Sequence, residues 1–264
     1  MNKVAVLIPS YKPKEYFEQC LMSLENQILD KHKFTVYIAL NGPKDEYEKF
    51  VFELLKKVSF EYQYIYLEQA GVSNARNKLI DLSSEEYIVF IDDDDLVSEH
   101  YLENLLSVST DKFMAIANIY NFEKDINNLK ENYIGKTFDF LDDTETSKYK
   151  IRKYFSSPVA KMIHRSMIQD IKFDEKVSRG EDSLFMAMIS KNVLGIQKTN
   201  KDTNYYVYER EGSATRKKVK RSKELKTLFY LTHQYTKLFF KKDYEKLFIL
   251  TRIVATLRKI LKIF

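Results

Sequence analysis

The first part of the chain alternates short apolar runs with longer segments in which apolar residues recur at helical spacing. The runs are rich in β-branched and aromatic residues, and they predict strands at residues 3–8, 34–40, 62–67 and 86–91. The intervening segments predict helices at residues 14–27, 47–58 and 72–82. The pattern is therefore a repeated alternation of strand and helix.

This alternation predicts an α/β fold with a mostly parallel, doubly wound sheet and helices on both of its faces. In such sheets, ligands bind beyond the carboxyl ends of the strands. The unusual residues of the chain follow the predicted strands: Pro9, Ser10 and Tyr11; Asn41 and Gly42; and the aspartates Asp92, Asp93, Asp94 and Asp95. We therefore expect a binding crevice at this edge of the sheet.

The second part of the chain has a weaker pattern. It predicts helices at 101–108 and 183–191, strands at 114–122 and 204–209, an ordered segment at 160–168, and a loop-rich insertion at 123–153. Two helices are predicted at 222–240 and 244–264. We expect a domain at 1–215, with a donor-binding half at 1–98 and an acceptor-binding half at 99–215, followed by a basic amphipathic helical extension at 216–264.

Composition limits the class of protein. With 264 residues, 44% of them hydrophobic, the chain is long enough for a sizeable core. Its one cysteine, Cys20, excludes an intramolecular disulfide and a metal site built from several thiolates, and this fits a reducing compartment. The apolar run near the N-terminus is too short for a signal peptide or a membrane span, so we expect a cytoplasmic protein.

The formal net charge of +5 hides an asymmetry along the chain. Residues 216–264 contain 15 Lys and Arg but only 3 Asp and Glu, whereas residues 1–215 contain 28 basic and 35 acidic residues. A basic amphipathic tail has three interpretations: packing on the domain, contact with the anionic inner face of a membrane, and nucleic-acid binding. The sequence has no recognised nucleic-acid motif, so we rank that interpretation last and expect no nucleic-acid partner.

The run of four aspartates indicates a site for a divalent cation. Adjacent carboxylates repel one another, and a hard cation with oxygen ligands relieves that repulsion. Mg²⁺ is typically held by one or two carboxylates together with substrate phosphate oxygens, and Mn²⁺ prefers similar ligands. The alternative is an acidic loop that caps the following helix. The position of the run at a strand end favours the metal site.

Six segments resemble, in order, the motifs of glycosyltransferase family 2, the inverting nucleotide-sugar-dependent enzymes with a GT-A fold. The resemblance covers roughly residues 3–213, about four-fifths of the chain, and six ordered matches are far more specific than any one. The segments are VLIPSYK at the first strand, NGPKD after the second, QAGVSNARN at 69–77, VFIDDDD at 89–95, FDE at 173–175 and GEDSLF at 180–185.

The resemblance implies roles for residues on the donor side. Pro9, Ser10 and Tyr11 would cradle the nucleoside, Asn41 would contact the base, and Arg76 would lie against the base or the phosphates. Asp92 would reach the ribose, and Asp93 is the weakest donor-site candidate. Asp94 is the expected metal ligand, with Asp95 as an alternative or indirect one. The implied cofactor is Mn²⁺ or Mg²⁺, and the implied donor is a UDP-sugar.

The resemblance also implies roles on the acceptor side. Asp182 would be the general base that takes the proton of the acceptor hydroxyl, and Glu181 would hydrogen-bond the acceptor. Without the resemblance, these two acids would simply enrich a helix N-terminus. Arg210, Ser213 and Arg216 would lie on a loop that closes over the diphosphate, the alternative being a plain exposed loop.

The expected function is therefore an inverting transfer of a hexose or N-acetylhexosamine to a glycan or lipid-linked acceptor, in the synthesis of a surface polysaccharide. A lipid-linked acceptor would bring the protein to the inner membrane face. One alternative is a sugar-phosphate nucleotidyltransferase, which should carry a glycine-rich phosphate loop after the first strand, whereas SYKPKEY contains no glycine. Another is a non-catalytic nucleotide-sugar binding protein, against which the presence of Asp92, Asp94 and Asp182 argues.

Overall fold

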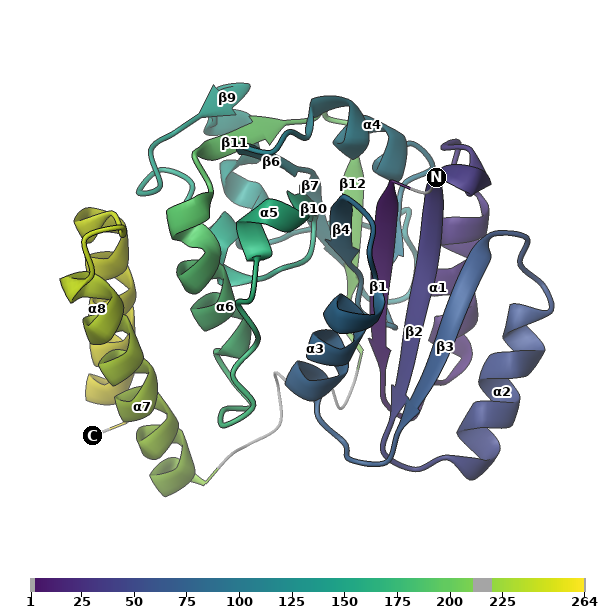
Figure 1. Cartoon of the computed structure of the whole chain (residues 1–264), viewed down its shortest axis with the longest axis horizontal. Coiled ribbons are helices and arrows are strands. Elements are labelled where there is room, and N and C mark those ends of the chain that lie inside the picture. Colours follow the sequence, from purple (N-terminus) through teal and green to yellow (C-terminus); the bar gives the residue numbers. More distant parts are fainter. Residues whose placement is uncertain (1–2, 211–219, 264) are drawn as a thin grey trace.

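A computed structural model describes residues 3–210 and 220–263 of the chain (Figure 1). Its main element is an eight-stranded sheet with the order β3-β2-β1-β4-β10-β6-β11-β9. The first four strands are mutually parallel, as the sequence predicts, and they are β1 (Val4–Ser10), β2 (Phe34–Asn41), β3 (Glu61–Leu67) and β4 (Tyr87–Phe90). The α/β fold class is thus confirmed.

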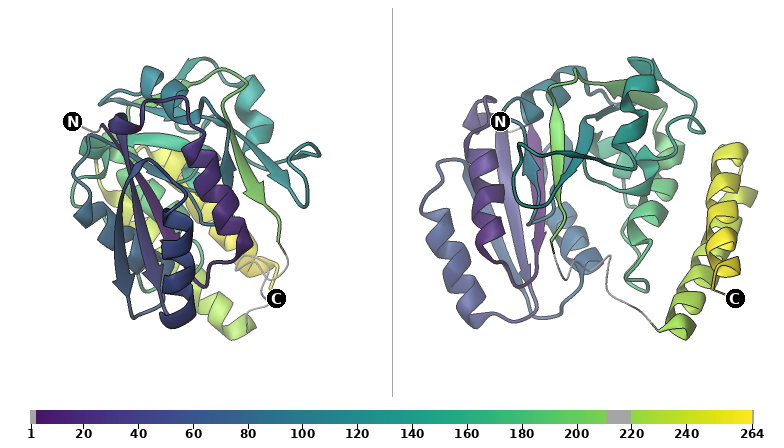
Figure 2. Two further views of the ribbon diagram at one scale, coloured as in Figure 1. Left: turned by 90° about the vertical axis from the view of Figure 1, so that its right-hand side faces the viewer. Right: turned by 180° about the vertical axis from the view of Figure 1, so that it is seen from behind.

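The strands at the centre of this parallel half are buried on both faces. Every residue of β1 and β2 is buried, which is why these segments are continuous apolar runs rather than alternating ones. Figures 1 and 2 show α3 (Val72–Leu82) on one face of β1 and β2 and α1 (Glu15–Glu25) on the other. Helix α2 (Asp45–Leu55) connects β2 to β3, and all three helices lie close to their predicted ranges.

The second half departs from a simple parallel sheet. Strand β10 (Lys161–His164) runs antiparallel to both β4 and β6 (Phe113–Ile116), while β11 (Gly195–Lys198) is parallel to β6. The short strand β9 (Thr144–Glu145) completes the edge. Segment 160–168, predicted only as ordered, therefore contains a strand followed by the short helix α5 (Arg165–Ile168).

A second, four-stranded sheet is a feature that the hydrophobic pattern did not predict. Its order is β5 (Leu96–Val97), β12 (Asn204–Tyr208), β7 (Asn118–Phe122) and β8 (Lys130–Glu131). The single strand predicted at 114–122 was wrong, because the chain breaks at Ala117 and its two pieces, β6 and β7, join different sheets. Strand β12 brings the segment before Arg210 back beside the aspartates, since it pairs with β5.

Three helices complete the side of the fold beyond β10. Helix α6 (Glu181–Ile189) carries Glu181 and Asp182 in its first turn and contacts α7 (Arg221–Phe240), which forms an antiparallel hairpin with α8 (Lys246–Leu261) (Figure 1). The predicted C-terminal helical extension is thus confirmed. The remaining elements are α4 (Tyr101–Val108) and the 3₁₀-helices at Lys31–Lys33, Gly135–Phe140, Tyr154–Ser156 and Ser190–Asn192.

Candidate active site at the carboxyl ends of the strands

The four aspartates point alternately inward and outward. Asp93 and Asp95 are buried, whereas Asp92 and Asp94 are only partly buried. Ser10 Oγ donates to Asp93 at 2.6 Å. Asp95 accepts from the Tyr205 hydroxyl at 2.7 Å and from the Tyr208 backbone N–H at 2.9 Å. The inward carboxylates are therefore held by uncharged protein donors, whereas Asp92 and Asp94 are partly exposed.

Arg76 joins the end of β4 to the start of α6. Its side chain is buried, and its two terminal nitrogens lie 2.8 Å from Asp92 Oδ1 and 2.5 Å from Asp182 Oδ1. The guanidinium also lies over the ring of Phe173, 5.3 Å from its centroid. Burial raises the pKa of Asp182, and Arg76 opposes that shift. The predicted donor-side and acceptor-side carboxylates are thus brought together around one arginine.

Glu181 presents a buried carboxylate oxygen without a partner among the described residues. It occupies the first turn of α6, directly after Gly180, whose φ of 84° is left-handed. Burial and the neighbouring Asp182 raise the pKa of Glu181 to about 7. The buried atom Oε2 accepts no hydrogen bond from the described part of the chain. An unpaired buried acceptor is costly, so this oxygen is suited to receive a hydroxyl group of a ligand.

Asp94 is paired with Arg210, the last described residue before the gap at 211–219. Arg210 Nε lies 2.5 Å from Asp94 Oδ2, and the guanidinium lies 4.8 Å from the ring centroid of Tyr16. Burial and the charge of Asp92 raise the pKa of Asp94, whereas Arg210 lowers it. A cationic group therefore already lies beside Asp94, the carboxylate that the sequence predicts to be the metal ligand. Ser213 and Arg216, the other two predicted loop residues, lie outside the described residues.

Of the residues predicted to hold the nucleoside, three are buried and one, Tyr11, is exposed. Pro9 and Ser10 are buried in β1. The Asn41 amide donates to Ser10 O at 2.7 Å and accepts from Gly71 N at 2.9 Å, so it ties the end of β1 to the start of α3. Tyr11 is 47% exposed, and Lys12 Nζ lies 5.5 Å from its ring centroid. The base contact of Asn41 stays a prediction.

Gly42 packs closely against the Tyr11 ring. Its φ of 96° is left-handed, and a Cβ atom built on it would lie 2.7 Å from Tyr11 Cε2. Any other residue at this position would strain the turn and push the ring aside. The position of the exposed aromatic side chain therefore depends on a glycine that the sequence marks only by its place after the second predicted strand.

The aspartate site fits a divalent cation that takes most of its ligands from a substrate. Within residues 3–210 and 220–263, no three His, Cys, Asp or Glu side chains gather as a closed metal site. Two carboxylates, Asp92 and Asp94, are only partly buried, and each is paired with an arginine, Arg76 and Arg210 respectively. One or two carboxylates plus diphosphate oxygens is the usual arrangement for Mg²⁺ in nucleotide sites.

Some residues of the site gave no signal in the sequence. Tyr205, on β12, holds Asp95, and Tyr16, on α1, stacks on Arg210. Lys161 is fully buried and donates to the carbonyls of Ser157 at 2.7 Å and Val159 at 2.5 Å; burial lowers its pKa to about 7. A lysine inside a strand could have been noticed as an irregular feature of the run 160–168, but its partners are set by the fold.

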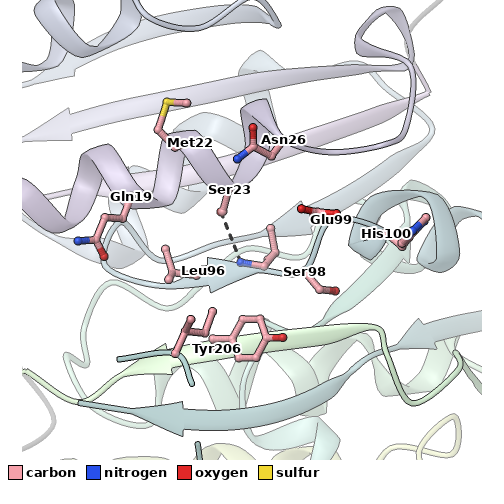
Figure 3. A pocket seen from close by; sticks show the side chains of 11 residues that line it. Gln19, Met22, Ser23, Asn26, Leu96, Ser98, Glu99, His100 and Tyr206 are labelled. Atoms are coloured by element: carbon pink, nitrogen blue, oxygen red, sulfur yellow. Dashed lines mark hydrogen bonds between the residues drawn. The ribbon is translucent and has the colours of Figure 1, made fainter. Parts of the chain in front are cut away.

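A separate groove, with a volume of about 600 Å³, lies between α1 and the small sheet (Figure 3). Its lining includes Ser23, Leu96 and Tyr206 but no predicted site residue. Tyr206 follows Tyr205 on β12, and neighbouring side chains of a strand point to opposite faces. The groove is therefore on the other face of the small sheet from the Tyr205–Asp95 contact.

Comparisons with known proteins place this geometry in a family. Residues 5–172 match the family described as glycosyl transferase family 2. Glycosyltransferase GlyA of Streptococcus pneumoniae is 25% identical over 230 residues, which are 81% of this chain and 32% of GlyA. The poly(ribitol-phosphate) beta-N-acetylglucosaminyltransferase TarS of Staphylococcus aureus is 23% identical over 219 residues, which are 80% of this chain and 36% of TarS. The chain thus spans about a third of the length of these two relatives.

Solved structures support the same fold. The crystal structure of S. aureus TarS 1–349 in complex with UDP-GlcNAc superposes with a TM-score of 0.76 at 19% identity, covering 98% of this chain and 73% of the other. A mannosyltransferase from Pyrobaculum calidifontis, in complex with GDP-Man and Mn²⁺, gives a TM-score of 0.69 at 13% identity, covering 99% and 72%. At these identities the likeness establishes the shared fold.

Proposed function

The chain belongs to glycosyl transferase family 2, and we propose that it is a metal-dependent, inverting hexosyltransferase that uses a UDP-sugar. The observation that carries the proposal is the bridge from Asp92 through Arg76 to Asp182. It supports a site in which a donor-binding carboxylate and a catalytic base are held by one arginine. A UDP-sugar is proposed because the related TarS has been solved with UDP-GlcNAc.

On the donor side, each outward carboxylate has one role. Asp92 binds the ribose, and Asp94 holds Mn²⁺ or Mg²⁺ together with the diphosphate. When bound, the metal neutralises the negative charge of the departing diphosphate. Tyr11 packs against the base, and Arg210 supplies a further positive charge near the diphosphate. Asp93 and Asp95 position the loop rather than touch the ligand, because both carboxylates are buried and accept hydrogen bonds from uncharged groups of the protein.

On the acceptor side, Asp182 acts as the base. The acceptor oxygen attacks the anomeric carbon, its proton passes to the free oxygen of Asp182, and the bond from the anomeric carbon to the diphosphate breaks, releasing UDP. Arg76 occupies the other oxygen, Oδ1, and fixes the orientation of the carboxylate. Glu181 accepts a hydrogen bond from the acceptor through its unpartnered Oε2. Attack from the side opposite the diphosphate gives inversion.

We propose a glycan or lipid-linked acceptor in the synthesis of a surface polysaccharide. The name of TarS, which refers to a poly(ribitol-phosphate) acceptor, supports a polymer of the cell surface as the substrate class. The division into donor-binding 1–98, acceptor-binding 99–215 and a basic extension 216–264 that contacts the inner membrane face belongs to the same proposal. The pairing of β5 with β12 means that the two halves share a sheet.

The alternatives predicted from sequence are less well supported. A nucleotidyltransferase needs a glycine-rich phosphate loop after its first strand, but β1 ends at Ser10 and the chain then continues through Tyr11, Lys12 and Pro13 to α1. A non-catalytic binding protein has no need for a carboxylate such as Asp182, held by Arg76 and partly open to the crevice.

The experiment that tests the proposal is release of UDP from a panel of UDP-hexoses and UDP-N-acetylhexosamines in the presence of Mn²⁺. We expect slow UDP release from at least one donor, with water as acceptor, and a decrease of about 100-fold or more in Asp182→Asn, because a general base typically contributes 10²–10⁴-fold. Equal rates for the wild type and Asp182→Asn would reject Asp182 as the base.

A further inference from the structure

Helix α8 exposes a continuous apolar stripe along one side. Its five members recur at intervals of three and four residues, so they lie on one face of the helix. All are aliphatic. They are Leu247 (54% exposed), Leu250 (43%), Val254 (36%), Leu257 (43%) and Leu261 (74%). We refer to these residues as the α8 stripe.

The opposite face of α8 already supplies the contacts that hold the hairpin in place. Phe248, Ile249 and Ile260 are buried, and Phe248 packs against Phe155 with ring centroids 5.1 Å apart. Arg252 donates to the backbone carbonyl of Arg152 on the same inner side. The α8 stripe is therefore additional apolar surface, beyond what the fold uses to attach this helix.

Positive charge borders the α8 stripe. Helical geometry places Arg258 and Lys262 along one side of it. On the other side, Lys246 donates to the backbone carbonyls of Phe239 and Lys241. Helix α8 itself contains no acidic residue. Long basic side chains can lay their methylene groups along an apolar surface while the charged ends reach outward. The combination of an aliphatic stripe and cationic borders is complementary to a surface of acyl chains beneath anionic headgroups.

We propose that the α8 stripe docks onto an anionic lipid bilayer, with α8 lying in the plane of the interface. This inference extends the proposed function, because it assigns the membrane contact to one face of one helix. Spanning does not fit: a helix of 16 residues is about 24 Å long, less than the roughly 30 Å of a bilayer core. Within the described part of the chain, no helix combines the length and hydropathy required to cross a membrane.

The position of the hairpin is compatible with a membrane-bound acceptor. Figure 1 shows α7 and α8 at the outer edge of the molecule, beyond α6, whose first turn carries Asp182. Helix α8 runs back toward the end of the molecule at which β1, β2 and β3 finish. Docking through α8 would therefore bring the membrane to the side of the fold that includes α6, the helix that carries the proposed base.

Vesicle flotation tests the proposal with the full chain. The probes are vesicles of phosphatidylcholine alone and of phosphatidylcholine with about one-third phosphatidylglycerol. We expect binding to the anionic vesicles, a decrease of at least tenfold in the partition coefficient for Leu250→Ser/Leu257→Ser, and a smaller decrease for Arg258→Gln/Lys262→Gln. The matched control is Leu82→Ser/Leu194→Ser, which changes leucines of similar exposure elsewhere (40% and 51%) and should bind like the wild type.

Two further measurements separate this inference from its alternatives. Thermal stabilisation by UDP with Mn²⁺ should be the same in the wild type and in Leu250→Ser/Leu257→Ser, so failure of lipid docking and failure of the proposed function are distinguishable. Light scattering after size exclusion reports self-association. Equal flotation of the stripe variant and the wild type would overturn the proposal, as would a wild-type dimer that the stripe substitutions dissociate.

Discussion

Arg76 Nη1 lies 2.5 Å from Asp182 Oδ1, although the two residues are 106 positions apart. The contact joins α3, which covers the parallel half of the sheet, to the first turn of α6. Because Arg76 also bonds Asp92, one buried cation is shared between two carboxylates that we assign to donor and acceptor chemistry. The geometry of catalysis should therefore depend on the shape of this side chain and not only on its charge.

Replacement of Arg76 by lysine tests that dependence. A lysine keeps the positive charge but cannot present two nitrogens to two carboxylates in a fixed plane. We expect UDP release by Arg76→Lys to fall by at least about tenfold, which corresponds to 1.4 kcal/mol of lost transition-state stabilisation. Arg221→Lys, at the exposed first residue of α7, is the control and should retain full activity. Wild-type activity in Arg76→Lys would show that charge alone suffices.

The alternation of the aspartates predicts different effects for Asp94 and Asp95. Asp95→Ala removes the acceptor of Tyr205 Oη and Tyr208 N, so we expect a loss of about 1–3 kcal/mol in the free energy of unfolding. Asp94→Ala leaves only the partly exposed Arg210 without its partner, and stability should change by less than about 1 kcal/mol. Urea denaturation measures both values. A larger loss in Asp94→Ala than in Asp95→Ala would contradict the assignment of inward and outward roles.

The pairing of Arg210 with Asp94 predicts a competition with metal. Arg210 must leave this carboxylate before a cation can bind to it, so Arg210→Ala should bind Mn²⁺ more tightly than the wild type in the absence of nucleotide. The same variant should bind UDP with Mn²⁺ more weakly, because a charge near the diphosphate is lost. Isothermal titration of each ligand separates the two effects. Parallel changes in both affinities would reject the competition.

Glu181 predicts a pH dependence of stability. Its pKa is raised from 4.5 to about 7 in the folded chain, so the folded state holds the proton more tightly than the unfolded state. This contribution to the free energy of unfolding is fully present below pH 4.5 and is lost as the pH rises through about 7. The contribution is at most about 3 kcal/mol. Between pH 5 and pH 8, the melting temperature of the wild type should therefore fall more than that of Glu181→Gln. Identical slopes would place Glu181 in a solvated environment.

The sequence predicted those parts of the fold that depend on local pattern. The strands before Tyr11, Asn41 and Asp92 are continuous apolar runs, and burial on both faces explains why their pattern was clear. Strand β10 was not predicted as a strand, because its four residues include the buried Lys161, whose hydrogen bonds to Ser157 and Val159 come from the folded loop. Local pattern carries no information about such partners.

The candidate site was likewise predicted only in part from the sequence. The run of aspartates marked its place, but which carboxylates face a ligand depends on Ser10 and Tyr205, which come from other strands. Asn41 was expected to contact a base, which stays a prediction, and the structure adds that its amide bridges Ser10 and Gly71. The sequence cannot distinguish four identical neighbouring aspartates. Their division into buried and partly exposed carboxylates could therefore be found only from the tertiary structure.

Calorimetric titration of UDP tests the central claim most directly, because it measures whether Asp94 binds a cation that in turn binds the diphosphate. We predict that the wild type binds UDP in the presence of Mn²⁺, that EDTA weakens binding by at least about tenfold, a difference of 1.4 kcal/mol, and that Asp94→Asn behaves with Mn²⁺ as the wild type does with EDTA. The contrary result is UDP binding that is equally strong with Mn²⁺, with EDTA and in Asp94→Asn.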